Sequence, residues 1–267
     1  MSLRINNNVE AYNAHRQLVG TSAKLAKSME KLSSGYRINR AADDAAGLAI
    51  SEKLRGQISG LGQAERNVQD AVSLVQTAEG SLAEVHSMLQ RVRELAVQYK
   101  NGTLSSSDQA AIQSEVNMLA SEIERIGSAA QFNGISLLNN TQAVTFQVGA
   151  EDGETINVAM ISLGSSVPTT TFDLSSSVAI NNLDNAIGAV SNQRSVFGAV
   201  QNRLEHTLNN VQTYKENLLA SESRIRDVDM AKEMVELTKL QVLQQAGTAM
   251  LAQANQAPQS VLSLLRG

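Results

Sequence analysis

The chain has 267 residues, enough for one large domain or two small ones. It contains no Cys and no Trp, and aromatic residues make up 3% of it, which excludes a disulfide framework, thiol chemistry and a core built on large rings. The formal net charge of −4 argues against broad nucleic-acid binding, and the lack of any run of about eighteen apolar residues argues against a membrane span. This composition favours an interaction protein over an enzyme.

Amphipathic segments at both ends of the chain, residues 1–33 and 230–265, are expected to be helices. Both consist mainly of Ala, Leu, Val, Gln, Asn and Ser, and each carries an apolar stripe that needs a partner helix in water. We therefore expect the subunit to pack against copies of itself. The first residues lack the apolar centre of a cleavable signal peptide, so export would need a route without cleavage.

The strongest pattern in the sequence predicts a long helix over residues 57–100. Apolar or small residues recur there at alternating steps of three and four, which is the spacing of a coiled-coil seam. The seam positions are Leu61, Ala64, Val68, Ala71, Val75, Ala78, Leu82, Val85, Leu89, Val92, Ala96 and Tyr99.

A shorter helix is expected over residues 105–128, after a turn at Asn101-Gly102. Ser107 and Asp108 are the expected N-caps. The inner face of this helix is predicted to consist of Ile112, Val116, Leu119, Ile123 and Ile126.

The hydrophobic period changes to two over residues 143–162, where apolar residues alternate with polar ones on both sides of Glu151-Asp152-Gly153. This pattern predicts a β-hairpin with an acidic turn. The Ser/Thr-rich residues 164–177 that follow are expected to form a connector.

A second seam predicts a helix over residues 178–222 that pairs antiparallel with the first long helix. Its positions, three of them polar, are Leu183, Ala186, Val190, Gln193, Phe197, Val200, Leu204, Thr207, Val211, Tyr214, Leu218, Ser221, Ile225 and Val228. The predicted fold is mainly α: a long antiparallel coiled-coil rod with one small β-hairpin.

Nothing in the sequence predicts a catalytic, cofactor-binding or metal-binding residue, so we expect no enzyme activity and no cofactor. His15, His86 and His206 are far apart and form no H-E-x-x-H motif, and no glycine-rich phosphate loop occurs. Charged residues gather just after the first predicted helix and near the end of the second seam. They are expected to form ion pairs between helices. They are Arg37, Arg40, Asp43, Asp44, Arg224, Arg226, Asp227 and Asp229.

Several long runs, in this order, resemble bacterial flagellin over nearly the whole chain. They are SSGYRINRAADDAAGLAISEKLRGQISGL at 33–61, QRVRELAVQ at 90–98, QFNGISLL at 131–138, FQVGAEDGETI at 146–156, GAVQNRLEH at 198–206, SRIRDVDMAKEM at 223–234 and QQAGTAMLAQANQAPQSVLSLLR at 244–266. Larger family members carry a variable outer domain where this chain has only the connector, so it resembles a minimal form.

The resemblance implies a structural subunit that polymerises into the extracellular flagellar filament for swimming motility. Residues 1–40 and 225–267 would form an inner layer of paired terminal helices, with Val261, Leu262, Leu264 and Leu265 as inner-layer contacts. Residues 41–224 would form an outer rod. The resemblance further implies that Arg91, Leu95 and Glu115 lie between protofilaments and are read by a host innate immune receptor in the free subunit.

The implied partners are copies of the same chain, an export chaperone, the filament cap and junction proteins, and that receptor, with no nucleic acid and no membrane. Two other functions remain open at this point. A flagellar hook–filament junction protein shares terminal patterns with flagellin, and a signalling rod of chemoreceptor type also has long Ala-rich heptads. The predicted β-hairpin and the absence of an apolar span argue against the second.

Overall fold

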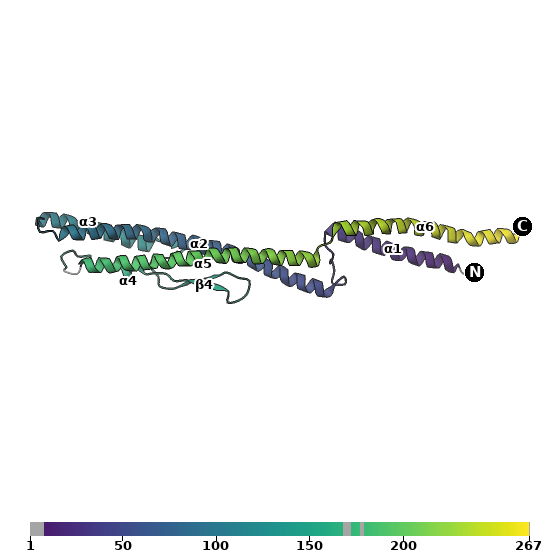
Figure 1. Ribbon diagram of the computed structural model, residues 1–267, viewed down its shortest axis with the longest axis horizontal. Helices are drawn as coiled ribbons and strands as arrows, with labels where there is room; N and C mark the ends of the chain where they lie inside the picture. Colours follow the sequence, from purple (N-terminus) through teal and green to yellow (C-terminus); the bar gives the residue numbers. More distant parts are fainter. Residues whose placement is uncertain (1–7, 168–171, 177–178, 267) are drawn as a thin grey trace. The chain divides into compact units, whose positions relative to one another are not determined.

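The computed structural model describes residues 8–167, 172–176 and 179–266, and it describes no side chains for 166 and 257–266 (Figure 1). The mainly α fold is confirmed. The elements are α1 (Val9–Ser34), α2 (Ala45–Tyr99), α3 (Ser106–Ala129), β1 (Gln131–Phe132), β2 (Ile135–Ser136), β3 (Val144–Gln147), β4 (Thr155–Val158), α4 (Leu163–Ser166), α5 (Ala179–Arg226) and α6 (Met230–Arg266).

The chain divides into two compact units. The terminal unit consists of Met1–Gly56 and Leu218–Gly267, and the central unit of Gln57–Asn217. These boundaries lie further from the chain ends than the predicted 40 and 225. Helix α2 also begins at Ala45, well before the predicted residue 57, because the heptad pattern that fixed the prediction starts only at Leu61.

In the central unit, α2 and α5 pair antiparallel, and three ion pairs fix their register. Arg93 lies 2.6 Å from Asp184, Glu79 lies 3.7 Å from Arg194, and Glu65 lies 3.0 Å from Lys215. From pair to pair, the residue number on α2 increases while that of its partner on α5 decreases. The predicted antiparallel arrangement is therefore confirmed.

The first seam forms the core of the central unit. Every predicted position from Leu61 to Ala96 is buried, and Tyr99 is half-buried. The second seam is buried at Leu183, Ala186 and Val190 and then at every second position down to Val211, after which Tyr214 is exposed. The inner face of α3 joins the same core through Ile112, Val116 and Ile123. Burial of this much apolar surface is the main term that stabilises the unit.

Helix α3 begins at Ser106, two or three residues earlier than its predicted caps imply. Ser105 is the N-cap, and its Oγ accepts a hydrogen bond from the Asp108 amide while the Asp108 carboxylate accepts one from the Ser105 amide. The prediction of Ser107 and Asp108 as N-caps is therefore wrong, since Asp108 is the third residue of a capping box instead.

The predicted β-hairpin is confirmed as the antiparallel pair β3–β4, in which Phe146 faces Ile156 and Val144 faces Val158. A second, unpredicted hairpin joins β1 to β2 through Asn133 and Gly134, whose φ angles are 49° and 79°. Asn-Gly is the sequence signal for such a turn, and it was missed because each strand has only two residues. The predicted connector includes the short helix α4.

In the terminal unit, α1 and α6 lie side by side and antiparallel (Figure 1). Near one end of the pair, Asn8 Nδ2 donates to the Ala254 carbonyl oxygen at 2.7 Å, and near the other, Lys31 Nζ lies 3.9 Å from Glu233. Two heptad seams face each other along the pair. They are Ala11, Ala14, Leu18, Thr21, Leu25, Ser28 and Leu32 on α1, and Glu233, Leu237, Leu240, Gln244, Gly247, Leu251 and Ala254 on α6.

The two connections of the terminal unit are hydrogen-bonded to each other. The Arg37 amide donates to the Arg226 carbonyl oxygen at 2.6 Å, and the Val228 amide donates to the Gly35 carbonyl oxygen at 3.0 Å. Ile38 is buried beneath this joint and lies so close to Gly47 that a Cβ there would be 2.8 Å from its Cδ1. The joint therefore ties the α1–α2 connection to the α5–α6 connection.

Candidate assembly surfaces

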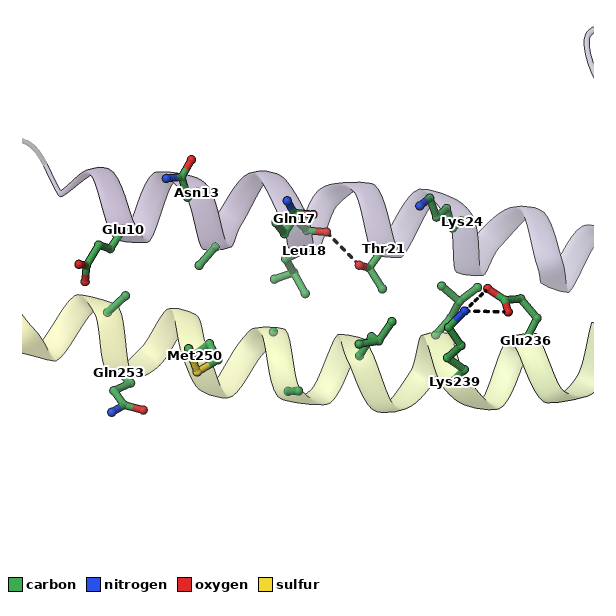
Figure 2. Close-up of a pocket in the computed structure, with 16 residues that line it drawn as sticks. Glu10, Asn13, Gln17, Leu18, Thr21, Lys24, Glu236, Lys239, Met250 and Gln253 are labelled. Atoms are coloured by element: carbon green, nitrogen blue, oxygen red, sulfur yellow. Dashed lines mark hydrogen bonds and ion pairs between the residues drawn. The ribbon is translucent and has the colours of Figure 1, made fainter.

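The α1–α6 pair leaves an open groove of about 860 Å³ along one side (Figure 2). Leu18 from α1 and Leu240, Leu243 and Met250 from α6 supply its apolar lining. The helices carry charged residues at its rim, namely Glu10, Lys24, Glu236 and Lys239. An apolar floor with a charged rim is the composition expected of a contact surface for another helix.

A second apolar surface lies on α6 next to the groove. We call it the α6 face and define it as Met234, Val235, Val242 and Leu243, which line one shallow depression together with Thr238 and Lys239. Val235 is 70% exposed and Val242 is 59% exposed. Helix α1 also carries exposed apolar residues, Tyr12 and Val19, seven positions apart on its side away from the groove.

The seam between α1 and α6 does not close into a core. Among its residues with described side chains, only Ser28 and Leu240 are buried, and the remainder are half-buried. Ser28 Oγ is buried without a hydrogen-bond partner in the described part of the chain. The pair therefore buries little of the apolar surface that it carries.

The predicted inner-layer contacts Val261, Leu262, Leu264 and Leu265 fall near the end of α6. The helix backbone continues through them to Arg266, but their side chains lie outside the described residues. Their role stays a prediction.

Arg91 projects from α2 toward solvent, as the heptad pattern predicted, and its side chain is 52% exposed. Its guanidinium lies 3.1 Å from Glu115 on α3 and 3.2 Å from Glu94. The two carboxylates, Glu115 first, raise the pKa of the Arg91 guanidinium. The structure thus brings Arg91 and Glu115 together in one exposed cluster, to which Glu94 adds a charge that sequence reasoning did not single out.

Leu95 does not belong to that cluster. It is 2% exposed and lies in the core of the central unit, so the prediction that it shares the outward face of Arg91 is wrong. The reason is that α3 packs beside this part of α2, as the Arg91–Glu115 pair shows, which widens the buried stripe beyond one seam. The burial of Leu95 argues against a direct receptor contact in the folded central unit, and the receptor role of this surface stays a prediction.

Ion pairs surround the joint of the terminal unit, although with partners other than those predicted. Arg40 lies 3.0 Å from Glu30, and Arg226 lies 2.6 Å from Glu52 and stacks over the Tyr36 ring at 4.9 Å. Asp43 does form its predicted type of contact: a 2.6 Å pair with Lys27, helped by the Asn39 and Arg40 amides, lowers the pKa of Asp43 to about 2.

Across the described ranges, no three His, Asp or Glu side chains gather in a way that would hold a metal ion. Among the helices that were described, none is both long and apolar enough to cross a membrane.

Two family models match the chain. Residues 5–143 match the bacterial flagellin N-terminal helical region, and residues 180–265 match the bacterial flagellin C-terminal helical region. Together they span the predicted helical parts and leave the β3–β4 region and the connector between them.

Full-length relatives agree with the family models. A flagellin from Halalkalibacterium halodurans is 55% identical, covering 98% of this chain and 99% of the relative. A flagellin from Bacillus subtilis is 47% identical, covering 99% and 100%, and a flagellar filament 33 kDa core protein from Treponema phagedenis is 48% identical, covering 98% and 99%. The crystal structure of Bacillus cereus flagellin has a TM-score of 0.51 at 33% identity, covering 59% of this chain and 94% of that one.

Proposed function

Because this chain belongs to the bacterial flagellin family, we propose that the α1–α6 pair supplies the contacts that join its copies in the filament. Flagellins are structural proteins and not enzymes, and they polymerise into the extracellular flagellar filament. The chain is such a structural subunit. The junction-protein and signalling-rod alternatives are not favoured, since the full-length relatives are flagellins and filament core proteins.

The observation that carries the proposal is the incomplete burial of the seam between α1 and α6. In an isolated two-helix pair, ordering the backbone costs about 1–2 kcal/mol per residue, and only apolar burial offsets most of it. The seam residues are mostly small or half-exposed, so the pair itself supplies little burial. Neighbouring copies would supply the remainder.

We place the α6 face of one copy against the α1–α6 groove of the next. The α6 face is apolar and the groove has an apolar floor, and the two surfaces lie next to each other and share Leu243 and Lys239. A contact between two different surfaces is heterologous, and it repeats without closing unless the rotation happens to complete a ring. Such a contact produces a filament.

The double substitution Val235→Asp and Val242→Asp tests this contact. Both residues are exposed, so the free subunit should fold normally, while two carboxylates buried against a neighbour should stop seeded elongation. Gln241→Asp is the matched control, because Gln241 is an exposed α6 residue that lines neither surface. Normal elongation of the double variant, followed by light scattering and electron microscopy, would refute the contact.

We also propose that residues 1–40 and 225–267 form the inner layer of the filament and residues 41–224 the outer layer. In this arrangement Val261, Leu262, Leu264 and Leu265 extend the apolar surface of α6. Deleting residues 255–267 should prevent filament growth and leave the central unit helical by circular dichroism. Filaments of normal length from the truncated chain would remove these residues from the contact.

The remaining partners follow from the same surfaces. An export chaperone that covers the α6 face would keep free subunits from associating before export. The filament cap and junction proteins would meet the same groove and face at the two ends of the filament. A host innate immune receptor would read the exposed Arg91–Glu115 cluster in the free subunit, since Arg is enriched among the residues that contribute most to binding energy.

A further inference from the structure

Two of the exposed methionines lie on the surfaces that we assign to assembly. Met250 lines the α1–α6 groove and is 61% exposed, and Met234 belongs to the α6 face and is 50% exposed. Figure 2 shows Met250 on α6 at the groove. Met118 on α3 is 71% exposed but belongs to the central unit, so the chain itself offers a methionine of similar accessibility away from both surfaces.

We propose that Met234 and Met250 form an oxidation site through which a hydroperoxide blocks the addition of a free subunit to the filament. The thioether sulfur of each residue attacks one peroxide oxygen, and the O–O bond breaks as the S–O bond forms. The other oxygen takes up a proton and leaves as water when the oxidant is hydrogen peroxide. The sulfur is oxidised by two electrons and the peroxide is reduced by two. This inference rests on the proposed function.

Oxidation at these positions should spare the fold of the free subunit. Neither side chain is part of the buried core, so a sulfoxide there remains solvated. The substitution of a flexible apolar thioether by a polar sulfoxide matters only when the surface is covered.

The α6 face around Met234 offers the sulfoxide few donors, whereas the groove around Met250 is also lined by the donors Asn13, Gln17, Lys24 and Gln253. Leu18, Leu240 and Leu243 line the groove beside Met250, and Val235 and Val242 share the α6 face with Met234. The one ammonium group common to both surfaces, that of Lys239, is engaged by the Glu236 carboxylate at 3.1 Å. A sulfoxide oxygen buried on the α6 face would lose its hydrogen bonds to water without replacement, which disfavours the contact.

The same geometry protects the residues after assembly. A neighbouring copy that lies on the groove and the α6 face excludes the oxidant from both sulfurs. Free subunits would thus be sensitive to peroxide and polymerised ones insensitive, and the reaction would select against subunits oxidised before they reach the filament tip. Methionine sulfoxide reductases reverse the modification, so the block is not permanent.

The test treats free subunits with hydrogen peroxide and maps sulfoxides by peptide mass spectrometry before seeded elongation. Oxidised wild type and oxidised Met118→Leu should elongate at least about tenfold more slowly, the factor that corresponds to ~1.4 kcal/mol. The double variant Met234→Leu and Met250→Leu should elongate at its untreated rate after the same treatment. Reduction of oxidised wild type by the two sulfoxide reductases should restore elongation, and this arm needs no variant.

A second readout compares oxidation rates in free subunits and in filaments. Met234 and Met250 should react much more slowly in the filament than in the free subunit. Normal elongation of wild type that carries both sulfoxides, an equal loss in the double Leu variant, or equal oxidation rates in both states would each overturn the inference. The Val235→Asp and Val242→Asp variant needs no oxidant, so failure of the assembly proposal itself is recognised separately.

Discussion

The two units have the same heptad spacing, but they bury it to different degrees. In the central unit, the α2 seam from Leu61 to Ala96 is buried throughout, because α3, α5 and the β3–β4 hairpin contribute to one core. In the terminal unit, the α1–α6 seam stays half-exposed and apolar side chains remain on its outer sides. A heptad pattern therefore predicts a helix and its inner face, but only the number of partners decides whether that face becomes a core.

The largest effect is expected from a charge in the buried seam. Leu82 is fully buried in the middle of α2, and Leu82→Asp should destabilise the central unit by several kcal/mol, more than the about 2–5 kcal/mol of a truncation to Ala. Val242→Asp in the terminal unit should change the stability of the free subunit by no more than about 0.5 kcal/mol. Thermal melts of both variants by circular dichroism measure the difference, and similar melting curves would erase the contrast between the units.

A somewhat smaller effect is expected at Leu95. Its truncation to Ala should cost about 2–5 kcal/mol of stability, as for other buried leucines, because the side chain lies in the core. Denaturant titration of the free subunit gives the value. Loss of receptor affinity without loss of stability would mean that Leu95 is at the surface after all.

Arg91, four residues before it, should behave in the opposite way. Arg91→Ala should leave the fold within about 0.5 kcal/mol of wild type, since exposed ion pairs contribute little. Binding to the receptor ectodomain should weaken by about 2 kcal/mol if Arg91 is a hot spot. The titration needs a thermal melt as control, and equal affinity of both proteins would remove Arg91 from the recognition site.

The smallest effect concerns acid and the joint of the terminal unit. The pKa of Asp43 is lowered from 3.8 to about 2 mainly by Lys27, so the native state favours the carboxylate and its contribution to stability is complete above about pH 4. This contribution should be lost as the pH falls toward 2. An NMR titration of the Asp43 carboxyl tests the shift, and Lys27→Met should move the midpoint upward. An unchanged midpoint would mean that the pair does not persist in solution.

The sequence predicted the central unit better than the terminal one, and the reason is physical. An uninterrupted seam such as Leu61–Ala96 determines the helix, its inner face and its antiparallel pairing together. All three follow from burying one apolar stripe in a single core. Leu95 was misplaced because burial by a third helix cannot be read from the period of one helix. The Ser105 cap and the Asn133-Gly134 hairpin depend on two or three residues, whose signals are weak beside a long repeat.

For the assembly surfaces, the sequence predicted that the terminal helices carry partnerless apolar stripes, and the structure shows where those stripes lie. Small residues such as Ala14 and Thr21 on α1 and Gly247 on α6 permit close approach but bury little area, which is why a groove remains. The outward position of Val235 and Val242 depends on which side of α6 faces α1. That choice follows from the pairing of two segments far apart in the chain and not from either segment alone.

Hydrogen exchange in the free subunit and in the filament tests most directly whether neighbours complete the α1–α6 pair. In the free subunit, amides of α1 and α6 should exchange much faster than those of α2 between Val68 and Val92, because the terminal pair lacks a closed core. In the filament, α1 and α6 should become as protected as α2. Strong and equal protection of all three helices already in the free subunit would contradict the account.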